Sequence, residues 1–224
     1  MLDKLVDVVA LSHKRCSRPI AAQLVYATPD NFLGRTVAAY TPGVTDFALL
    51  TKEAADSLCQ VQNELLTQHN LGLLIYDSYR PKTAVLDFVH FSKAPIHSDY
   101  ELARKQIHYP HIEKNQFFDL GYVAEDSQHC YGNTVDLVLV DTQDKELNHG
   151  ACFDYMDELS HINRTAADIG AEALKNRTIL SDAMQKFGFL TYPYEFWHYS
   201  FKEKSVHTPM DFPITEELRG LNVV

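Results

Sequence analysis

The chain has 224 residues, and its 20 Lys and Arg against 30 Asp and Glu give a formal net charge of −10 at pH 7. With 46% hydrophobic residues, including 12 Phe and 12 Tyr, the chain can bury a sizeable core, which excludes a disordered tail. The acidic balance and the lack of a Lys/Arg-rich run disfavour nucleic acid and anionic membranes as partners. No apolar run approaches the roughly 20 residues that a membrane span needs.

No repeat, low-complexity tract or Pro/Gly-rich linker interrupts the sequence, so we expect a single domain over residues 1–224. Acidic residues near the first Met stand where a secretory signal carries basic residues, which predicts a cytoplasmic protein. A signal sequence upstream of the given residues would instead make it periplasmic. The 4 cysteines form no Cys-x-x-Cys pair, which disfavours a zinc knuckle or a redox pair.

The first clear element is a helix between Thr51 and Asn70, where apolar residues recur every three or four positions. A short buried strand follows at residues 73–76, and residues 77–81 read as the turn that leaves it. Pro81 can occupy the first turn of a second helix. Arg80 is therefore expected at a strand-to-helix junction.

The second half begins with a polar stretch over residues 98–121 and then a β-branched, apolar run at 134–140 that predicts a central strand. Residues 163–186 are the longest helix candidate, with Gly188 as its stop, and residues 196–201 read as an aromatic strand. Antiparallel pairing of the last two strands, among irregularly spaced helices, predicts an α+β fold whose central, mostly antiparallel sheet is flanked by helices. A glycine-rich phosphate loop is missing, so a nucleotide cofactor has no support.

The segment from Ser127 to Asp136 is the most informative for chemistry. Asp136 lies on a strand that we expect to be buried, where a carboxylate is costly unless it is paired, hydrogen-bonded or bound to a metal. His129 lies on the preceding loop, and Gly132 can turn the chain so that imidazole and carboxylate converge. Such a pair suits zinc when a second histidine joins it. A plain hydrogen bond between His129 and Asp136 is the alternative.

Two further segments carry groups that such a site would use. His198 could bind the metal while Glu195 handles the proton of a bound water. Side chains three apart on a strand point to opposite faces, so Glu195 should lie at the strand's start, where the backbone bends. Arg80 could stabilise a developing oxyanion. Each segment taken alone has another interpretation. Glu195 and His198 could be incidental residues of an aromatic strand, and Arg80 could form a surface salt bridge.

Together, the three segments resemble a known family. Asp-x-Tyr-Arg-Pro, Ser-x-His followed by an Asp after six residues, and Glu-x-Trp-His look like the D-alanyl-D-alanine dipeptidases of the VanX type, over about residues 26–213. Those enzymes belong to a group of zinc D,D-peptidases that shares its fold with the Hedgehog signalling domain. The resemblance implies this Hedgehog/D,D-peptidase fold and zinc-dependent hydrolysis of D-alanyl-D-alanine, a small dipeptide, to free D-amino acids.

Position by position, the resemblance also implies roles for individual residues. One zinc ion per chain would be held by His129, Asp136 and His198, with Glu195 as the catalytic base and Arg80 as the group that polarises the scissile carbonyl. Three further residues would lie at the substrate. Asp154 would help to hold its ammonium group, and Tyr26 and Ser127 match substrate-binding positions near the bound dipeptide. Helix capping by Asp154, core packing by Tyr26 and a loop hydrogen bond by Ser127 are the alternatives.

The sequence departs from the family at two positions. Phe196 precedes Trp197 where two Trp are common, and Gln128 stands where a second Ser is familiar, which could alter pocket size or the second residue accepted. A zinc D,D- or L,D-carboxypeptidase acting on peptidoglycan stem peptides and a non-catalytic zinc-binding recognition module are the alternative functions. Oligomeric state and physiological role, whether vancomycin resistance, D-alanine recycling or cell-wall turnover, stay open.

Five other residues that could suggest metal binding are expected to have ordinary surroundings. His108 and His111 have ligand-like spacing, but the intervening proline predicts a solvated loop. Cys130 is expected to be a small buried residue. We expect His149 and His161 at the surface, because no spacing argument involves them.

Overall fold

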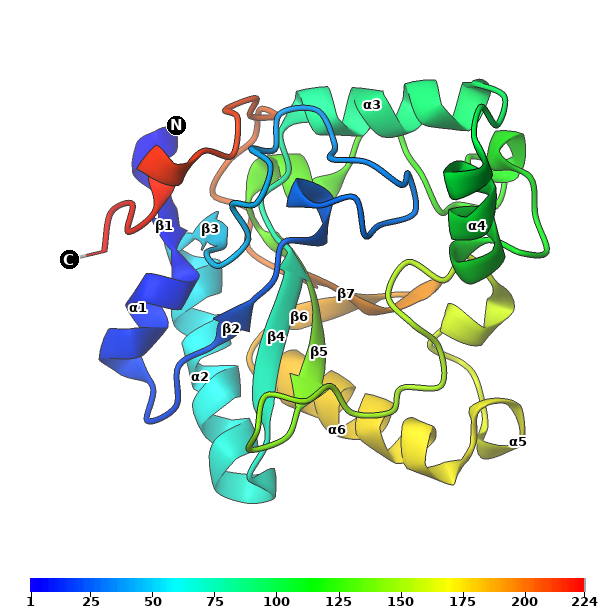
Figure 1. Cartoon of the computed structure of the whole chain (residues 1–224). Helices are drawn as coiled ribbons and strands as arrows, with labels where there is room; N and C mark the ends of the chain where they lie inside the picture. Colours follow the sequence, from blue (N-terminus) through cyan, green and yellow to red (C-terminus); the bar gives the residue numbers. More distant parts are fainter. Residues whose placement is uncertain (224) are drawn as a thin grey trace.

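The computed structural model describes residues 1–223, which form a mixed arrangement of sheets and helices (Figure 1). The strands are β1 (Leu5–Asp7), β2 (Ala21–Ala22), β3 (Leu49–Thr51), β4 (Gly72–Asp77), β5 (Thr134–Val140), β6 (Phe189–Tyr192) and β7 (Glu195–Phe201). The α-helices are α1 (Val8–Arg15), α2 (Lys52–His69), α3 (Lys82–Lys93), α4 (Asp99–His108), α5 (Ala166–Ile169) and α6 (Ala171–Lys186). Within residues 1–223, no helix combines the length and apolar character needed to cross a bilayer.

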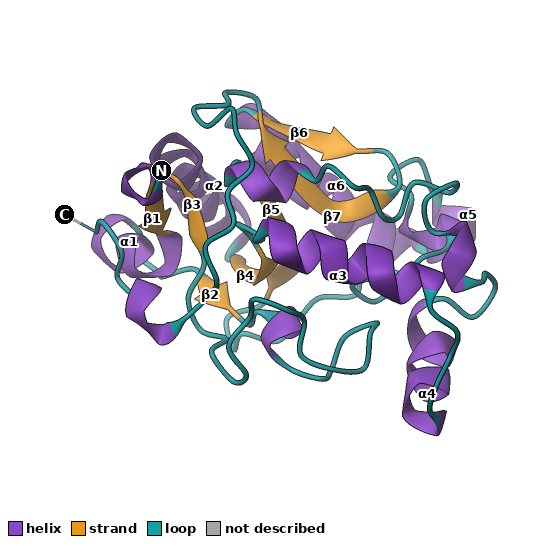
Figure 2. Ribbon diagram, turned by 90° about the horizontal axis from the view of Figure 1, so that it is seen from above, coloured by secondary structure: helices purple, strands orange, loops and turns teal. Residues whose placement is uncertain are grey.

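The main sheet has the strand order β2-β4-β5-β7-β6. β2 pairs with β4 in parallel, and the other three pairings are antiparallel, which confirms the expected mostly antiparallel sheet. β1 and β3 form a second, two-stranded sheet beside it. All of β5 is buried, as befits the middle strand of a sheet covered on both faces (Figure 2).

The two faces of β5 belong to different parts of the core. Val135, Leu137 and Leu139 pack in one cluster with residues of α2 and α6. Val138 belongs to the other cluster, which contains aromatic residues of α3 and of the loops above the sheet. Because side chains alternate along a strand, Asp136 shares the face of Val138. The carboxylate therefore points away from α2 and α6, toward α3 and the loops.

Five predicted elements are confirmed by α2, β4, α3, β5 and β7. The predicted continuous helix over residues 163–186 is wrong. Gly170 adopts a φ of 86°, and this left-handed backbone separates α5 from α6. The longest helix is α2 with 18 residues, whereas α6 has 16. α4 and β6 were not predicted as separate elements.

Gly132 connects the 3-10 helix η4 (Gln128–Tyr131) to β5 and so fixes where His129 lies relative to Asp136. Its φ is 73°, in the left-handed region that favours glycine. A Cβ atom at this position would lie 2.5 Å from Cδ2 of Leu5. Both the backbone and the neighbouring side chain therefore require glycine.

We expect Gly132→Ala to lower the free energy of unfolding by about 2–4 kcal/mol, the sum of left-handed strain and overpacking against Leu5. Gly43 is the matched control because its φ is 80° and nothing lies within 4 Å of its Cβ position. Gly43→Ala should cost only the strain, about 1–2 kcal/mol. Urea denaturation measures both, and equal losses would show that Leu5 does not restrict this position.

Candidate functional site

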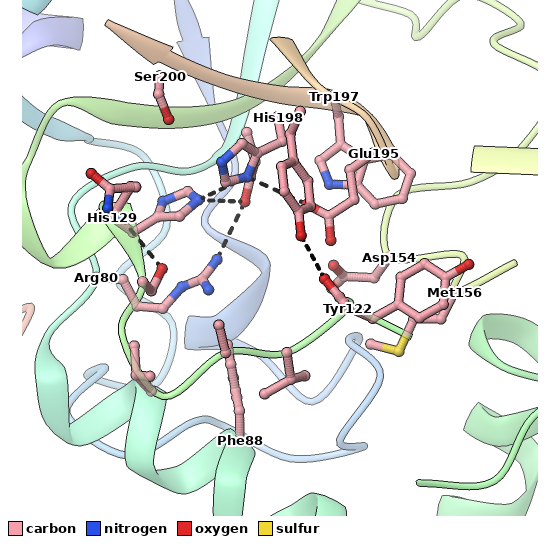
Figure 3. A pocket seen from close by; sticks show the side chains of 18 of the residues that line it. Arg80, Phe88, Tyr122, His129, Asp154, Met156, Glu195, Trp197, His198 and Ser200 are labelled. Atoms are coloured by element: carbon pink, nitrogen blue, oxygen red, sulfur yellow. Dashed lines mark hydrogen bonds and ion pairs between the residues drawn. The ribbon is translucent and has the colours of Figure 1, made fainter. Parts of the chain in front are cut away.

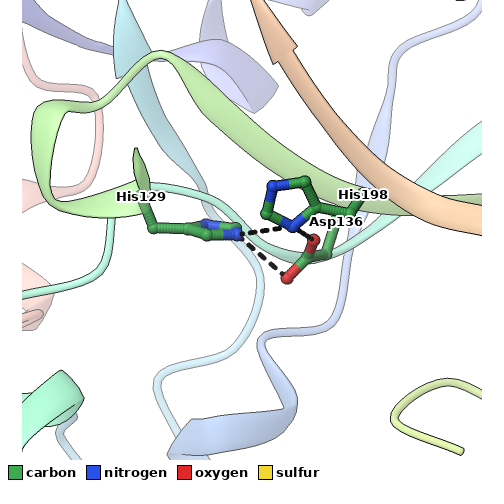
Figure 4. Close-up of side chains that lie close together, drawn as sticks. All are labelled: His129, Asp136 and His198. Atoms are coloured by element: carbon green, nitrogen blue, oxygen red, sulfur yellow. Dashed lines mark hydrogen bonds and ion pairs between the residues drawn. The ribbon is translucent and has the colours of Figure 1, made fainter. Parts of the chain in front are cut away.

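The site is organised around the carboxylate of Asp136, which is 2% exposed. Its Oδ2 lies 3.2 Å from Nε2 of His129 and 3.3 Å from Nη2 of Arg80. Its Oδ1 lies 3.1 Å from Nδ1 of His198 (Figure 4). Burial favours the neutral acid, but the two imidazoles outweigh it and hold the pKa of Asp136 far below its ordinary value. The strand thus presents a buried carboxylate anion.

His129 is oriented by the short helix η4. The Ser127 side chain accepts a hydrogen bond from the His129 backbone N–H at 3.4 Å, at the start of that helix. Nδ1 of His129 lies 2.6 Å from the carbonyl oxygen of Ser78. A carbonyl can only accept, so Nδ1 carries the proton, and in the neutral ring Nε2 directs its lone pair at the site. Metal-binding histidines are commonly oriented by such a second hydrogen bond.

His198 reaches the same point from the neighbouring strand, because β5 and β7 pair Asp136 directly with His198. Its Nδ1 lies 3.4 Å from Nε2 of His129. Burial disfavours an imidazolium, but the carboxylates of Asp136 and Glu195 raise the pKa of His198 to about 9. In the metal-free protein His198 is therefore protonated, and its positive charge lies next to the Asp136 carboxylate.

These three side chains fit a metal ion. One ligand atom from each of His129, Asp136 and His198 lies within 4.8 Å of the others. Oδ1 of Asp136 is buried without a hydrogen-bond partner among residues 1–223, although it lies near the His198 ring. A metal cation would satisfy that oxygen and replace the proton between the two ring nitrogens. Two imidazoles and one carboxylate are a donor set typical of zinc.

Glu195 is the first residue of β7, as expected from its spacing to His198. The register between β6 and β7 shifts where Tyr192 pairs with Glu195, so the backbone bends there. The bend brings Oε2 of Glu195 to 3.3 Å from Nδ1 of His198. The carboxylate therefore borders the proposed ligands.

Arg80 lies between β4 and α3, and a buried carboxylate fixes its position. Its Nε donates to Oδ2 of Asp77 at 2.7 Å, and Asp77 also accepts from the Tyr40 hydroxyl at 2.6 Å. The guanidinium carbon lies 4.9 Å from the centre of the Phe88 ring. Burial opposes the charge of Arg80, but Asp77 and other neighbours raise its pKa well above the ordinary value. Sequence reasoning missed Asp77 and Tyr40 as supports, although Asp77 belongs to the Asp-x-Tyr-Arg-Pro motif.

Asp154 faces the site from the segment that follows β5 (Figure 3). The Tyr26 hydroxyl donates to its carboxylate at 3.0 Å, so Tyr26 both packs in the core and contacts Asp154. Burial and the negative charges of Asp136 and Glu195 raise the pKa of Asp154 well above its ordinary value. Within residues 1–223, no Lys, Arg or His lies within ion-pair distance of this carboxyl. A cationic ligand would give it the missing partner.

A cavity of about 330 Å³ connects all of these groups. All eight side chains that the sequence singled out for the site line it: Tyr26, Arg80, Ser127, His129, Asp136, Asp154, Glu195 and His198. Its walls also include apolar and tyrosine side chains that the sequence did not identify, among them Phe88, Tyr122, Met156 and Tyr192 (Figure 3). The cavity is thus lined by both charged groups and apolar side chains.

Several secondary expectations need correction. His108 is not in a solvated loop, since it ends α4, is 5% exposed and faces the backbone carbonyl of Asp154. His149 is not at the surface, since it is 2% exposed and stacks on Phe196 at 5.3 Å. Phe196 does not line the cavity, whereas Trp197 does, so the expected change of pocket size at Phe196 has no direct basis. Cys130 is fully buried, as predicted.

Replacing Asp77 with Asn removes the charge that holds Arg80, so we expect a loss of about 3 kcal/mol in the free energy of unfolding. The matched control is Tyr40→Phe, which removes one hydrogen bond from the same carboxylate and should cost about 1–2 kcal/mol. Urea denaturation of the metal-free proteins compares the two variants. Equal losses would contradict a specific role for the Asp77–Arg80 pair.

Comparisons with known proteins identify the family of this chain. The model of the family described as D-ala-D-ala dipeptidase matches residues 8–214. A D-alanyl-D-alanine dipeptidase of Enterococcus faecium is 36% identical over 191 residues, which cover 84% of this chain and 90% of that protein. A protein of the same name from Enterococcus faecalis is 38% identical over 175 residues, covering 78% and 82%. Another from Streptomyces coelicolor is 38% identical over 191 residues, covering 84% and 90%. The chain belongs to the D-ala-D-ala dipeptidase family.

Proposed function

We propose that the protein hydrolyses D-alanyl-D-alanine and related D,D-dipeptides to free D-amino acids, using one zinc ion per chain. One observation supports this most directly. The ligand atoms of His129, Asp136 and His198 converge within 4.8 Å, in the same cavity that Glu195 and Asp154 line. The relatives named as D-alanyl-D-alanine dipeptidases supply the substrate class.

His129, Asp136 and His198 would hold the zinc ion, and three protein ligands are the number typical of a catalytic zinc site. When bound, zinc supplies a Lewis acid that polarises a carbonyl and activates water. The remaining tasks, which are proton transfer, charge stabilisation and substrate alignment, fall to side chains of the chain itself.

Glu195 is suited to proton transfer, because its carboxylate borders the ligands and faces the cavity. It would accept a proton from the attacking water and then deliver a proton to the leaving amine. Arg80 is suited to charge stabilisation, because Asp77 holds its guanidinium at the cavity wall and keeps it protonated. It would donate hydrogen bonds to the oxyanion that develops on the scissile carbonyl.

Asp154 would select substrates with a free amino terminus. Its carboxyl is buried, and the ammonium group of a dipeptide would supply the positive charge that favours its ionised form. A peptidoglycan stem with a blocked amino group would leave Asp154 without that partner. This preference favours a dipeptidase over a carboxypeptidase that acts on longer chains.

We also propose that residues 1–224 form one domain with the fold that zinc D,D-peptidases share with the Hedgehog signalling domain. Its support is the family match over residues 8–214 and the five-stranded, mostly antiparallel sheet.

The function is tested by incubating the protein with stereodefined dipeptides, with and without a chelator. D-Ala-D-Ala should be hydrolysed faster than its L,L and N-acylated forms, and chelation should stop the reaction. Preference for the N-acylated form would indicate a carboxypeptidase. Zinc binding without hydrolysis of any peptide would indicate a recognition module.

For Glu195→Gln we expect kcat to fall by roughly 10²- to 10⁴-fold with zinc content unchanged, because the substitution removes the base but none of the proposed zinc ligands. Glu203→Gln is the control, since Glu203 is exposed and outside the cavity. Steady-state kinetics and metal analysis give the two readouts. Unimpaired turnover by the Glu195 variant would remove this residue from its proposed role.

For Asp154→Asn we expect KM for D-Ala-D-Ala to rise about 10- to 100-fold, because a charge-assisted contact to the ammonium is worth about 1.5–3 kcal/mol. The preference over N-acetyl-D-Ala-D-Ala should shrink by the same factor. Glu158→Gln, an exposed change in the same segment, should alter neither value. An unaltered preference in Asp154→Asn would place ammonium recognition elsewhere.

A further inference from the structure

Asp154 belongs to an irregular segment, residues 149–161, that has only one short helix of its own, η5 (Glu158–Ser160). Gly150 and Asp154 adopt φ angles of 81° and 57°, both in the left-handed region. Such a backbone does not hold its shape by repeating hydrogen bonds, so contacts from other elements must define it. The Tyr26 hydroxyl contacts the Asp154 carboxyl directly, and contacts to the backbone of the segment help to fix where that carboxyl lies in the cavity.

Arg177 of α6 contacts both ends of this segment. Its Nε donates to the carbonyl of His149 at 2.6 Å. Its Nη2 donates to the carbonyl of Leu159 at 2.8 Å, and its Nη1 to the carbonyl of His161 at 3.2 Å. One guanidinium therefore holds the two ends of the segment together, and residues between these ends line the cavity.

The surroundings of Arg177 are unusual for a cation. It is 6% exposed, and no carboxylate within residues 1–223 lies within ion-pair distance. Burial lowers its pKa to about 10. A buried charge without a counterion is costly, so hydrogen bonds to backbone carbonyls and aromatic contacts must stabilise it. Nothing in the proposed catalytic steps uses this side chain directly.

Arg177 also contacts the strand that carries Glu195 and His198. Its guanidinium carbon lies 4.0 Å from the centre of the Phe196 ring, which belongs to β7. The ring of His149 stacks on the same phenyl group with an angle of 13° between the planes. One side chain thus links the segment with Asp154 to the strand with the proposed base.

Neighbouring residues of α6 strengthen this attachment. Asn176 donates from Nδ2 to the carbonyl of Asn148 at 2.8 Å. A Cβ at Gly150 would lie 2.7 Å from Cβ of Ile169, so the segment starts in close contact with α5. The middle of the segment is held separately, by the Met156 amide donating to the carbonyl of His108 at 2.7 Å. Arg177 is the residue that joins the two ends.

We propose that Arg177 is a positioning residue that holds Asp154 at a set distance from Glu195 and thereby determines affinity for the ammonium group of the substrate; this rests on the proposed function. Arginine is required because its planar fork carries donors on three separate nitrogens, whereas the three donors of lysine share one nitrogen. The role is indirect, since Arg177 does not line the cavity.

The test compares Arg177→Lys with Arg164→Lys, a control in which the arginine pairs with the exposed Glu158. We expect Arg177→Lys to raise KM for D-Ala-D-Ala roughly tenfold while kcat and zinc content stay within about twofold. Hydrogen exchange of the metal-free protein should be faster across residues 149–161. In an Asp154→Asn background, Arg177→Lys should change KM little, because both substitutions act on one contact. Arg177→Gln, which leaves no buried charge, replaces the lysine variant if that protein does not fold.

A KM effect of the same size with and without Asp154 would overturn the proposal, as would unchanged exchange across the segment. A lower Tm with unchanged KM would also overturn it, by reducing Arg177 to a stability residue. Failure of the proposed function is distinguishable, since it would appear as no D-Ala-D-Ala turnover by the unsubstituted protein. In that case the exchange experiment still decides whether Arg177 holds the segment.

Discussion

A carboxylate on the middle strand of a sheet is the constraint on which this structure depends. Asp136 occupies a buried position in the core, and a buried carboxylate is unfavourable unless positive charge compensates it. The His198 imidazolium and the Arg80 guanidinium provide positive charge, and the His129 ring faces the same carboxylate; the three side chains come from different parts of the chain. The fold must therefore bring three elements to Asp136. These are the short helix before β5, the neighbouring strand β7 and the junction after β4.

That meeting point also explains how the cavity acquires its chemistry. The groups that compensate Asp136 are the same groups that can bind a metal and stabilise an oxyanion, so stability and function depend on shared contacts. Other residues that do not line the cavity hold these groups in position. Asp77 holds Arg80, the Ser78 carbonyl orients His129, and Arg177 connects the Asp154 segment to β7. The structure thus surrounds a few reactive groups with buried polar contacts that fix their directions.

Much of this arrangement could be predicted from the sequence, because β5 and α2 have clear hydrophobic patterns and the site motifs are local in the chain. The break at Gly170 was missed because apolar spacing continues across it, and a glycine within a helical pattern does not by itself indicate a left-handed residue. His149 and Arg177 were missed for a different reason. A buried polar residue has the same local sequence signature as an exposed one, and only the packing of α6 against a distant segment reveals its burial.

The most direct test of the account is a zinc titration of the metal-free protein, with release of D-alanine from D-Ala-D-Ala as the readout. If His129, Asp136 and His198 form one catalytic metal site, activity should rise in proportion to added zinc and level off at about one equivalent per chain. Asp136→Asn should remain inactive at the same zinc concentrations. Full hydrolysis without metal, or full activity in Asp136→Asn, would contradict the account.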